Sequence, residues 1–293
     1  MNSYWLGVST LAGIYLIATL GISILTGFTG LFSLGHAGFM CIGAYASAVA
    51  TKMLGVPFYI GLIFSIIASV IVGYFVGYAT LRLRGDYFVI TTFALGEIVK
   101  LVIENMVTIT GGAKGMPDVK PGTTFQVVLI LDIIVILLLV NFLKSKYGRN
   151  CIAIREEEMA AKIIGIDVMK YKMTALLISC ALCGLAGGLL AHYMHYLHPN
   201  MFNMAKSNEL IVMVILGGQG SLTGTTVATI ALVFLPELLR IGAAQEWRMF
   251  AYGVLVVLII VLKPSGLFGN RELNLKGIVS PFKKLSSKTQ GGK

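Results

Sequence analysis

Three charged side chains interrupt one of the long apolar stretches of this sequence. Glu97, Lys100 and Glu104 follow one another at spacings of three and four residues, so a helix would place all three on one face, where they could neutralise one another. Charged groups at bilayer depth are often functional. Two interpretations therefore stand side by side. The three residues form a buried ion cluster that fixes helix packing, or they take part in gating or in lining a pathway.

The four histidines raise the possibility of metal chemistry. His192, His195 and His198 are spaced three apart, and with His36 they suggest a membrane enzyme of the desaturase kind. Such sites need two or more histidine clusters with acidic partners, and one loose cluster does not meet that requirement. We therefore expect no metal site. The sequence predicts instead that His192 and His195 hydrogen-bond between helices and that His198, which precedes a proline, ends a helix.

Two glycine-rich segments, 27–38 and 217–224, separate apolar stretches from one another. Such breaks at membrane depth are tolerated only inside protein or along a watery cavity, which makes them candidate pathway elements. The alternative is an ordinary tight loop at the surface. The residues selected as pathway or gating candidates in these breaks are Gly27, Gly30, Ser33, His36, Gly217, Gly218, Gln219 and Gly220.

The elements that must position these residues are membrane-spanning helices. Hydrophobic residues make up 57% of the 293-residue chain and charged residues 12%, and the apolar residues fall in blocks that reach the roughly 20 residues a helix needs to cross a bilayer. We therefore expect an all-α, polytopic transmembrane helical bundle of about eight to ten segments, some of them short or broken. The expected segments are 4–26, 31–51, 58–81, 86–107, 125–143, 173–197, 207–217, 222–240 and 247–263.

The basic residues predict how the bundle is oriented. If these nine segments alternate, sixteen Lys and Arg fall on one side of the membrane and six on the other. Cytoplasmic loops carry the excess, so the N-terminus is expected outside and the C-terminus in the cytoplasm. The net charge of +10 then needs no nucleic-acid partner, because a basic tail over 264–293 beside anionic membrane lipids explains it.

The polar segment 144–172 is the longest one between membrane segments, and it lies on the cytoplasmic side in this topology. Residues 155–166 combine strong helix formers with a glycine, Gly165, at the position of a helix stop. Ala160, Ile163 and Ile164 share one face of that expected helix. Three consecutive glutamates would be repelled by an anionic leaflet, which favours docking to a protein partner over lying on lipid.

Several motifs together resemble a known family. The run from Glu158 to Gly165 resembles the loop by which permeases of ABC importers dock on their ATPase, with Met159 inserted before the two alanines. That spacing resembles the branched-chain amino-acid permeases, and the chain is similar to their LivM-type subunits over roughly residues 20–265. The other segments that carry the resemblance are 27–38, 83–88, 93–98, 110–115 and 216–224.

The resemblance implies an assembly in the bacterial cytoplasmic membrane. It implies a heterodimer with a LivH-type permease, two cytoplasmic ABC ATPase subunits, and an extracytoplasmic binding protein that delivers leucine, isoleucine or valine. The chain itself has no Gly-x-x-x-x-Gly-Lys-Ser/Thr phosphate loop. We therefore expect a transport subunit rather than an enzyme, with no cofactor of its own and with ATP and magnesium bound by the partner ATPases. The expected coupling residues are Glu157, Glu158, Ala160, Ala161 and Gly165.

Two alternatives stay open at this point. The same ABC architecture could carry urea, a short-chain amide or another amino acid, because cargo choice rests largely with the binding protein. A secondary transporter driven by an ion gradient would also use broken helices and buried carboxylates such as Glu97 and Glu104. That second alternative gives the helix around Ala160 no purpose.

Overall fold

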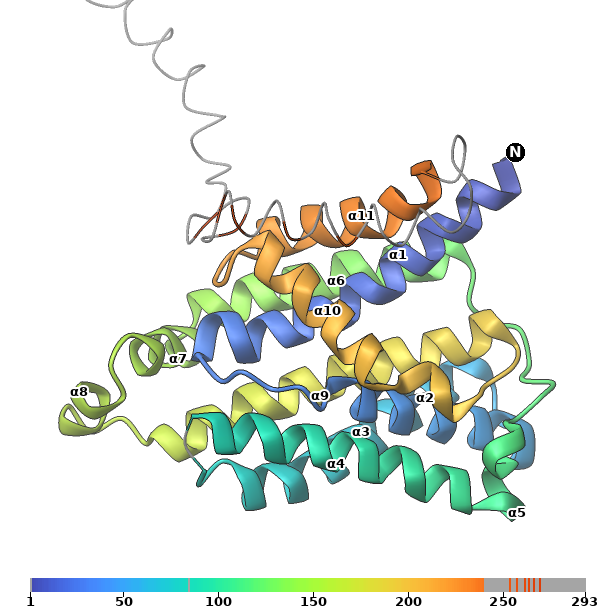
Figure 1. The fold of residues 1–293 in the computed structure, drawn as a ribbon, viewed down its shortest axis with the longest axis horizontal. Coiled ribbons are helices and arrows are strands. Elements are labelled where there is room, and N and C mark those ends of the chain that lie inside the picture. Colours follow the sequence, from blue (N-terminus) through green and yellow to red (C-terminus); the bar gives the residue numbers. More distant parts are fainter. Residues whose placement is uncertain are drawn as a thin grey trace, which may run out of the picture.

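The computed structural model describes residues 2–83 and 85–239, together with the isolated positions 253, 257, 261, 263, 266 and 269. The described residues form eleven α-helices and no β-strand, which confirms the all-α bundle (Figure 1). The α-helices are α1 (Asn2–Ile22), α2 (His36–Met53), α3 (Phe58–Thr80), α4 (Asp86–Asn105), α5 (Val107–Thr110), α6 (Phe125–Lys144), α7 (Lys146–Glu156), α8 (Glu158–Ile163), α9 (Val168–Met194), α10 (Met204–Gly217) and α11 (Leu222–Leu239).

Four of the described helices are long and apolar enough to cross a membrane: Ser3–Gly27, Phe58–Thr80, Phe125–Lys144 and Val168–Met194. The first of them is α1 continued by a turn of π-helix, η1 (Ser23–Gly27). Large apolar side chains on α3 and α6 point away from the protein; Phe75 is 68% exposed and Leu138 62% exposed. Such a surface is stable only against lipid or another apolar partner.

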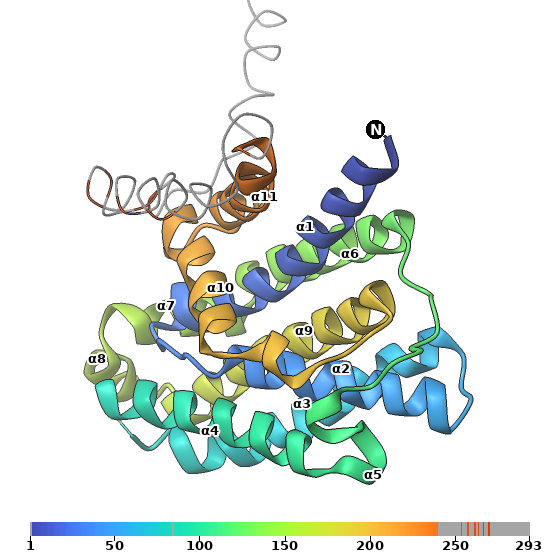
Figure 2. The same ribbon diagram turned by 45° about the vertical axis from the view of Figure 1, so that its right-hand side comes forward.

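The long helix α9 is the centre of the bundle. Figure 2 shows α9 between α1 on one side and α2 and α3 on the other, and all three pack against it. The packing is close because glycines replace side chains at the crossings: a Cβ on Gly187 would overlap the carbonyl oxygen of Met40, and one on Gly73 would lie 2.6 Å from Sγ of Cys180. Glycines on α3 and α9 therefore let the helices of the bundle approach closely.

Several membrane segments have different bounds from those predicted. The segment expected at 31–51 begins as a helix only at His36, because residues 30–35, which lead into α2, have no regular structure. The α9 helix begins at Val168, five residues before the predicted 173, because the Asp167 carboxylate accepts the Lys170 amide and caps it (3.2 Å). The predicted segment 247–263 and the basic tail 264–293 lie outside the continuously described residues.

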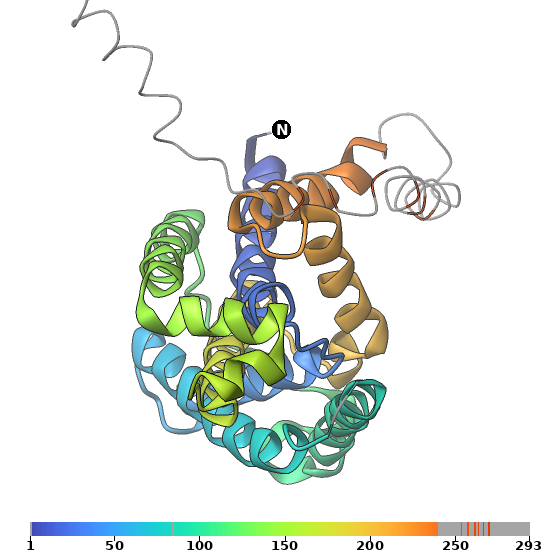
Figure 3. The same cartoon turned by 90° about the vertical axis from the view of Figure 1, so that its left-hand side faces the viewer.

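The two ends of the bundle carry different structures. The N-terminus of α1 lies at the opposite end from α7 and α8, and α5 lies at the N-terminal end (Figure 1). Figure 3, viewed from the end that carries α7 and α8, shows α1 near the middle with α6 on one side and α10 on the other. The cytoplasmic loop predicted at 144–172 is therefore one compact, helical structure at a single end of the molecule.

Candidate coupling site and helix breaks

The segment expected to be one helix over 155–166 is two helices that meet at Glu157. Glu157 is extended (φ −156°, ψ 104°), so α7 ends before it, and its carboxylate accepts the Met159 amide at the start of α8 (3.4 Å). The prediction of a single helix was wrong because Glu157 acts as a helix cap rather than as a helix former. The Ser145 hydroxyl caps α7 in the same way.

Gly165 ends α8, as the sequence predicted. Its φ of +85° lies in the left-handed region that favours glycine. The Gly165 amide donates to the Lys162 carbonyl and the Ile166 amide to the Ala161 carbonyl, both at 3.0 Å. This pair of hydrogen bonds is the Schellman motif, and it turns the chain back toward α9.

One expected coupling residue of α8, Ala161, lies on the face that packs against its own chain. Ala161 is only 2% exposed and packs against Ile154 and Val168 of the same chain, so it is not a free docking contact. The exposed side is instead apolar at three positions: Met159 is 59% exposed, Ile163 84% and Ile164 74%. Ala160 is exposed beside them.

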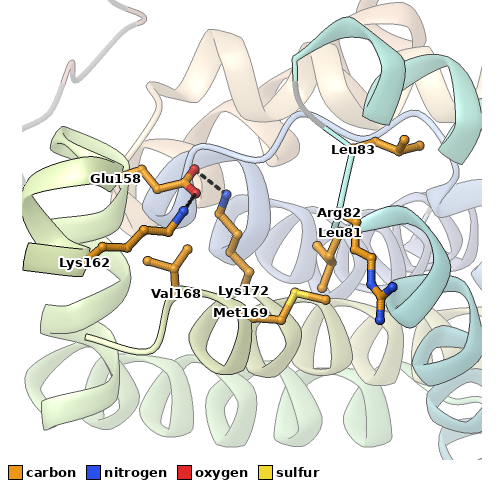
Figure 4. Close-up of a pocket in the computed structure, with 8 residues that line it drawn as sticks. All are labelled: Leu81, Arg82, Leu83, Glu158, Lys162, Val168, Met169 and Lys172. Atoms are coloured by element: carbon orange, nitrogen blue, oxygen red, sulfur yellow. Dashed lines mark hydrogen bonds and ion pairs between the residues drawn. The ribbon is translucent and has the colours of Figure 1, made fainter. Parts of the chain in front are cut away.

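Glu158 ties α8 to the first turns of α9. Its two carboxylate oxygens accept from Lys162 (2.9 Å) and Lys172 (2.7 Å), as Figure 4 shows. The hydrogen bonds from Lys172 and then Lys162 lower the pKa of Glu158 to about 2. The charge of Glu158, one of the expected coupling residues, is therefore compensated within the chain. The three residues line a cavity of about 170 Å³.

The two glycine-rich breaks meet in space. A Cβ on Gly27 would lie 2.8 Å from the Gly220 nitrogen, and the Thr225 hydroxyl donates to the Ser23 hydroxyl (3.4 Å). We call the contact of these four residues the glycine junction. Within the second glycine-rich break, Gly217, Gly218 and Gly220 are buried, whereas Gln219 is exposed. The structure therefore brings together two of the sequence-predicted pathway segments that are 190 residues apart in the chain.

His36 anchors the start of α2 and has no free ring nitrogen. Its Nδ1 lies 3.0 Å from the Ser33 carbonyl oxygen and its Nε2 lies 3.0 Å from the Ser179 hydroxyl on α9. A carbonyl only accepts, so Nδ1 carries the hydrogen and Nε2 of the neutral ring accepts from Ser179. Ser33 is buried as well, and the Gly35 amide donates to its hydroxyl (3.4 Å).

The three charges on α4 do not form one cluster. Lys100 pairs with Glu97 across a separation of 3.6 Å, with side chains 16% and 33% exposed. Among the residues that the structure describes, Glu104 makes no ion pair. The expected mutual compensation therefore holds for the first two residues and not for the third. Glu97 also lines a narrow crevice with Asn203 at the start of α10.

Two histidines of the cluster, His192 and His198, form hydrogen bonds within the chain. His192 is bonded through Nε2 to the Ser47 hydroxyl (2.9 Å) and through Nδ1 to the Lys120 carbonyl (2.7 Å). The prediction that His198 ends a helix was wrong, because α9 already ends at His195 in the left-handed conformation; the His198 ring instead caps the next helical turn by accepting the Asn200 amide (3.1 Å). No group of three metal-binding side chains occurs within the part of the chain that the structure describes.

Sequence reasoning missed Arg155 and Lys172 as site residues. The Arg155 guanidinium donates from Nη1 to the Gly27 carbonyl (2.8 Å), which connects α7 to the glycine junction. Both residues look like ordinary basic residues of a cytoplasmic loop, and no spacing rule connects them to Gly27 or Glu158. The sequence signal for internal pairing is that the acidic run Glu156–Glu158 lies between Arg155 and Lys162.

Comparison with known proteins gives one family. A model of the family described as "Branched-chain amino acid transport system / permease component" matches residues 4–261. The chain is 32% identical to the high-affinity branched-chain amino acid transport system permease protein LivM of Escherichia coli (strain K12), over 92% of this chain and 71% of that protein.

Two further relatives extend the similarity. A probable LivM permease of Methanocaldococcus jannaschii is 28% identical over 93% of this chain and 94% of that protein. The LivH permease of the Salmonella typhimurium high-affinity system is 25% identical over 90% and 94% of the respective chains. Both types of permease subunit therefore match nearly the whole chain.

Proposed function

The chain belongs to the family of branched-chain amino acid transport permease components, and we propose that it is the LivM-type membrane subunit of an ATP-driven importer of leucine, isoleucine and valine. Its relatives are transport permease subunits, and its apolar helices are those of a membrane protein. In the proposed assembly this chain forms one half of the translocation path and receives movement from an ATPase.

The observation that carries the coupling role is the exposed tip of α8. Met159, Ile163 and Ile164 are each more than half exposed on a helix that lies at one end of the bundle. Apolar side chains grouped on such a tip are typical of a surface that a protein partner covers. Glu157, Glu158 and Gly165 hold this tip in place through the cap, the ion pairs and the Schellman turn.

The proposed assembly also contains ATPase subunits, a second permease and a binding protein. Without a phosphate loop in its sequence, it relies on two partner ATPases that bind ATP and magnesium, and it needs no cofactor of its own. Because LivH permeases are similar to this chain over nearly its whole length, a LivH-type partner would present a comparable bundle and a second docking helix. An extracytoplasmic binding protein would deliver the amino acid.

The proposed orientation of the chain in the membrane depends on the distribution of its basic residues. With α7 and α8 in the cytoplasm, the N-terminus at the opposite end of the bundle lies outside, in agreement with the excess of basic residues on the α8 side. In this orientation the outer end of α9 and the loop between α5 and α6 face the binding protein.

The docking role is tested with Ile163→Asp in proteoliposomes that contain this chain, its partner permease, the two ATPases and the binding protein. A carboxylate at this position would be desolvated without a counter-charge in the docked state, which costs several kcal/mol. We expect the variant to insert normally, to lose the ATPase during purification, and to lose ATP-dependent uptake of radiolabelled leucine. Ile163 is chosen rather than Ala161 because Ile163 is exposed, whereas Ala161 is buried in the chain's own fold.

The matched control is Leu54→Asp, which places the same carboxylate at a 66% exposed apolar position at the other end of the bundle. This control should retain the ATPase. Wild-type uptake by the Ile163 variant would remove the docking role. Uptake of urea or an amide in place of leucine by the wild type would keep the docking role and change the cargo.

A further inference from the structure

Arg155 forms a direct bridge between the proposed docking helices and the glycine junction. It lies at the end of α7, two residues before the Glu157 turn into α8. Its Nη1 donates to the Gly27 carbonyl (2.8 Å), while its outer side is paired with Glu156. The side chain is 21% exposed, so it reaches inward from the surface of the bundle.

The carbonyl that Arg155 binds is suited to a cation. Gly27 is the last residue of η1, where a helix leaves its final carbonyls without internal partners and with a partial negative charge. A charged donor at this position makes a stronger hydrogen bond than a neutral one would. The contact therefore links α7 to the end of the first membrane helix by a charge-assisted hydrogen bond.

Gly30 supports the same contact from the other side. A Cβ on Gly30 would lie 3.1 Å from Cγ of Arg155, and the residue has φ of +75°. The neighbouring Thr29 hydroxyl donates to the Ile24 carbonyl (3.0 Å), which holds this part of the break against the end of the first helix. The break between α1 and α2 thus contacts α7 at Arg155, through both Gly27 and Gly30.

The other side of Gly27 is packed against the second break. The Gly27 backbone lies against Gly220, and Ser23 is bonded to Thr225 at the start of α11. A displacement of Gly27 by the length of a bond would therefore displace the loop between α10 and α11. Arg155 is the charged side chain that joins the docking structure to this junction.

We propose that Arg155 is the positioning residue that transmits movement of the docked α8 to the glycine junction, where the two broken segments open or close the cytoplasmic end of the pathway. This inference rests on the proposed function. When the hydrogen bond between Arg155 and the Gly27 carbonyl is lost, ATP hydrolysis and transport become uncoupled, although the ATPase stays bound at the exposed tip of α8.

The experiment compares Arg155→Gln, Arg155→Lys and Arg149→Gln in the complete reconstituted importer. Arg149 is the matched control, because it lies on the same helix and its guanidinium donates to Lys144 rather than to a break. Three quantities are measured: ATPase retained on the permease, ATP hydrolysis stimulated by leucine-loaded binding protein, and leucine taken up per ATP.

For Arg155→Gln we expect full ATPase retention and a fall in leucine taken up per ATP by about fivefold or more, the scale of a typical coupling energy between sites. Arg155→Lys keeps the charge and should restore part of the ratio, and Arg149→Gln should equal the wild type. Unchanged uptake per ATP in Arg155→Gln would overturn the proposal. Loss of the ATPase together with uptake would also overturn it, by making Arg155 a docking residue.

Gly30→Ala gives an independent test if the glutamine variant does not insert. Its added methyl group pushes on Arg155 without removing the charge, and the same fall in uptake per ATP is expected; wild-type coupling in both Gly30→Ala and Arg155→Lys would contradict the proposal. If the proposed importer function is wrong, the result differs, because the wild-type assembly would then neither retain an ATPase nor import leucine.

Discussion

At the scale of single residues, pairing decides what each charge can do. Glu158 and Glu97 are both acidic residues beside a lysine, yet Glu158 has two partners and Glu97 has one. Glu158 lies outside the membrane helices, and its paired carboxylate holds α8 against α9. Glu97 lies on α4, which the sequence predicts to cross the membrane, where the loss of its partner would leave a poorly solvated charge.

The Glu158 pairs should make the attachment of α8 depend on pH in one direction. Because pairing lowers the pKa of Glu158 from 4.5 to about 2, its contribution to stability is fully present above about pH 4.5 and is lost as the pH falls toward 2. We expect Glu158→Gln to lower the thermal stability of the purified chain slightly at pH 7, by roughly 0.2–1 kcal/mol for each partly exposed pair. Thermal unfolding of both proteins from pH 7 to pH 3 tests this, since the difference should shrink toward the acid end. A difference that grows in acid would contradict the assignment.

The charges on α4 predict a specific rescue. Lys100→Met should leave the Glu97 carboxylate uncompensated and lower the melting temperature of the purified chain. Adding Glu97→Gln should restore part of the loss, because it removes the orphaned charge. Glu104→Gln serves as the control and should restore nothing. Equal rescue by both carboxylate changes would show that all three residues act together, as the sequence spacing alone suggested.

At the scale of elements, the bundle depends on how closely α2 and α9 approach. The backbone of Gly187 on α9 lies directly against the Met40 carbonyl of α2, so the crossing has no room for a side chain. The same arrangement at Gly43 and Gly184 holds the next turn of the crossing. Close backbone contact of this kind is the main source of helix association where lipid removes the hydrophobic driving force.

Gly187→Ala is therefore expected to separate α2 from α9. An added methyl group in a filled crossing costs roughly 1–3 kcal/mol, so the melting temperature of the detergent-solubilised chain should fall by several degrees. Gly253→Ala is the control, because no heavy atom of the residues that the structure describes lies within 4 Å of a Cβ there. The thermal unfolding curves of the two variants give the comparison. An unchanged melting temperature in Gly187→Ala would mean that the crossing is looser than the structure indicates.

At the scale of the whole molecule, the two ends of the bundle must face different compartments. The four cysteines are all buried, so a single exposed cysteine introduced by mutation can be labelled selectively. Ile163 and Leu54 are both strongly exposed and lie at opposite ends of the bundle. They are therefore suitable positions from which to read the orientation.

We expect Ile163→Cys to react with a membrane-impermeant maleimide only in inside-out vesicles, and Leu54→Cys only in right-side-out vesicles. The physical reason is the excess of basic residues on the α8 side, which is retained in the cytoplasm. Reporter fusions at Met1 and after Lys263 give a second measurement of the same topology. Labelling of Ile163→Cys from the outside would invert the molecule and remove the docking proposal with it.

The sequence by itself determined the all-α fold, the four apolar helices long enough to cross a membrane, the family and the turn at Gly165. These features depend on local properties: the length of an apolar run, a glycine at a helix end, and motifs read in order along the chain. The tertiary structure decided which charges are paired, that Ala161 faces its own chain, and that the breaks at Gly27 and Gly220 meet beside Arg155. The contacts of Glu158 with Lys172, of Arg155 with Gly27 and of Gly27 with Gly220 join residues 14, 128 and 193 positions apart in the sequence. Helical periodicity carries no information at such separations, because only the packing of α1, α7, α9 and the α10–α11 loop brings the residues together.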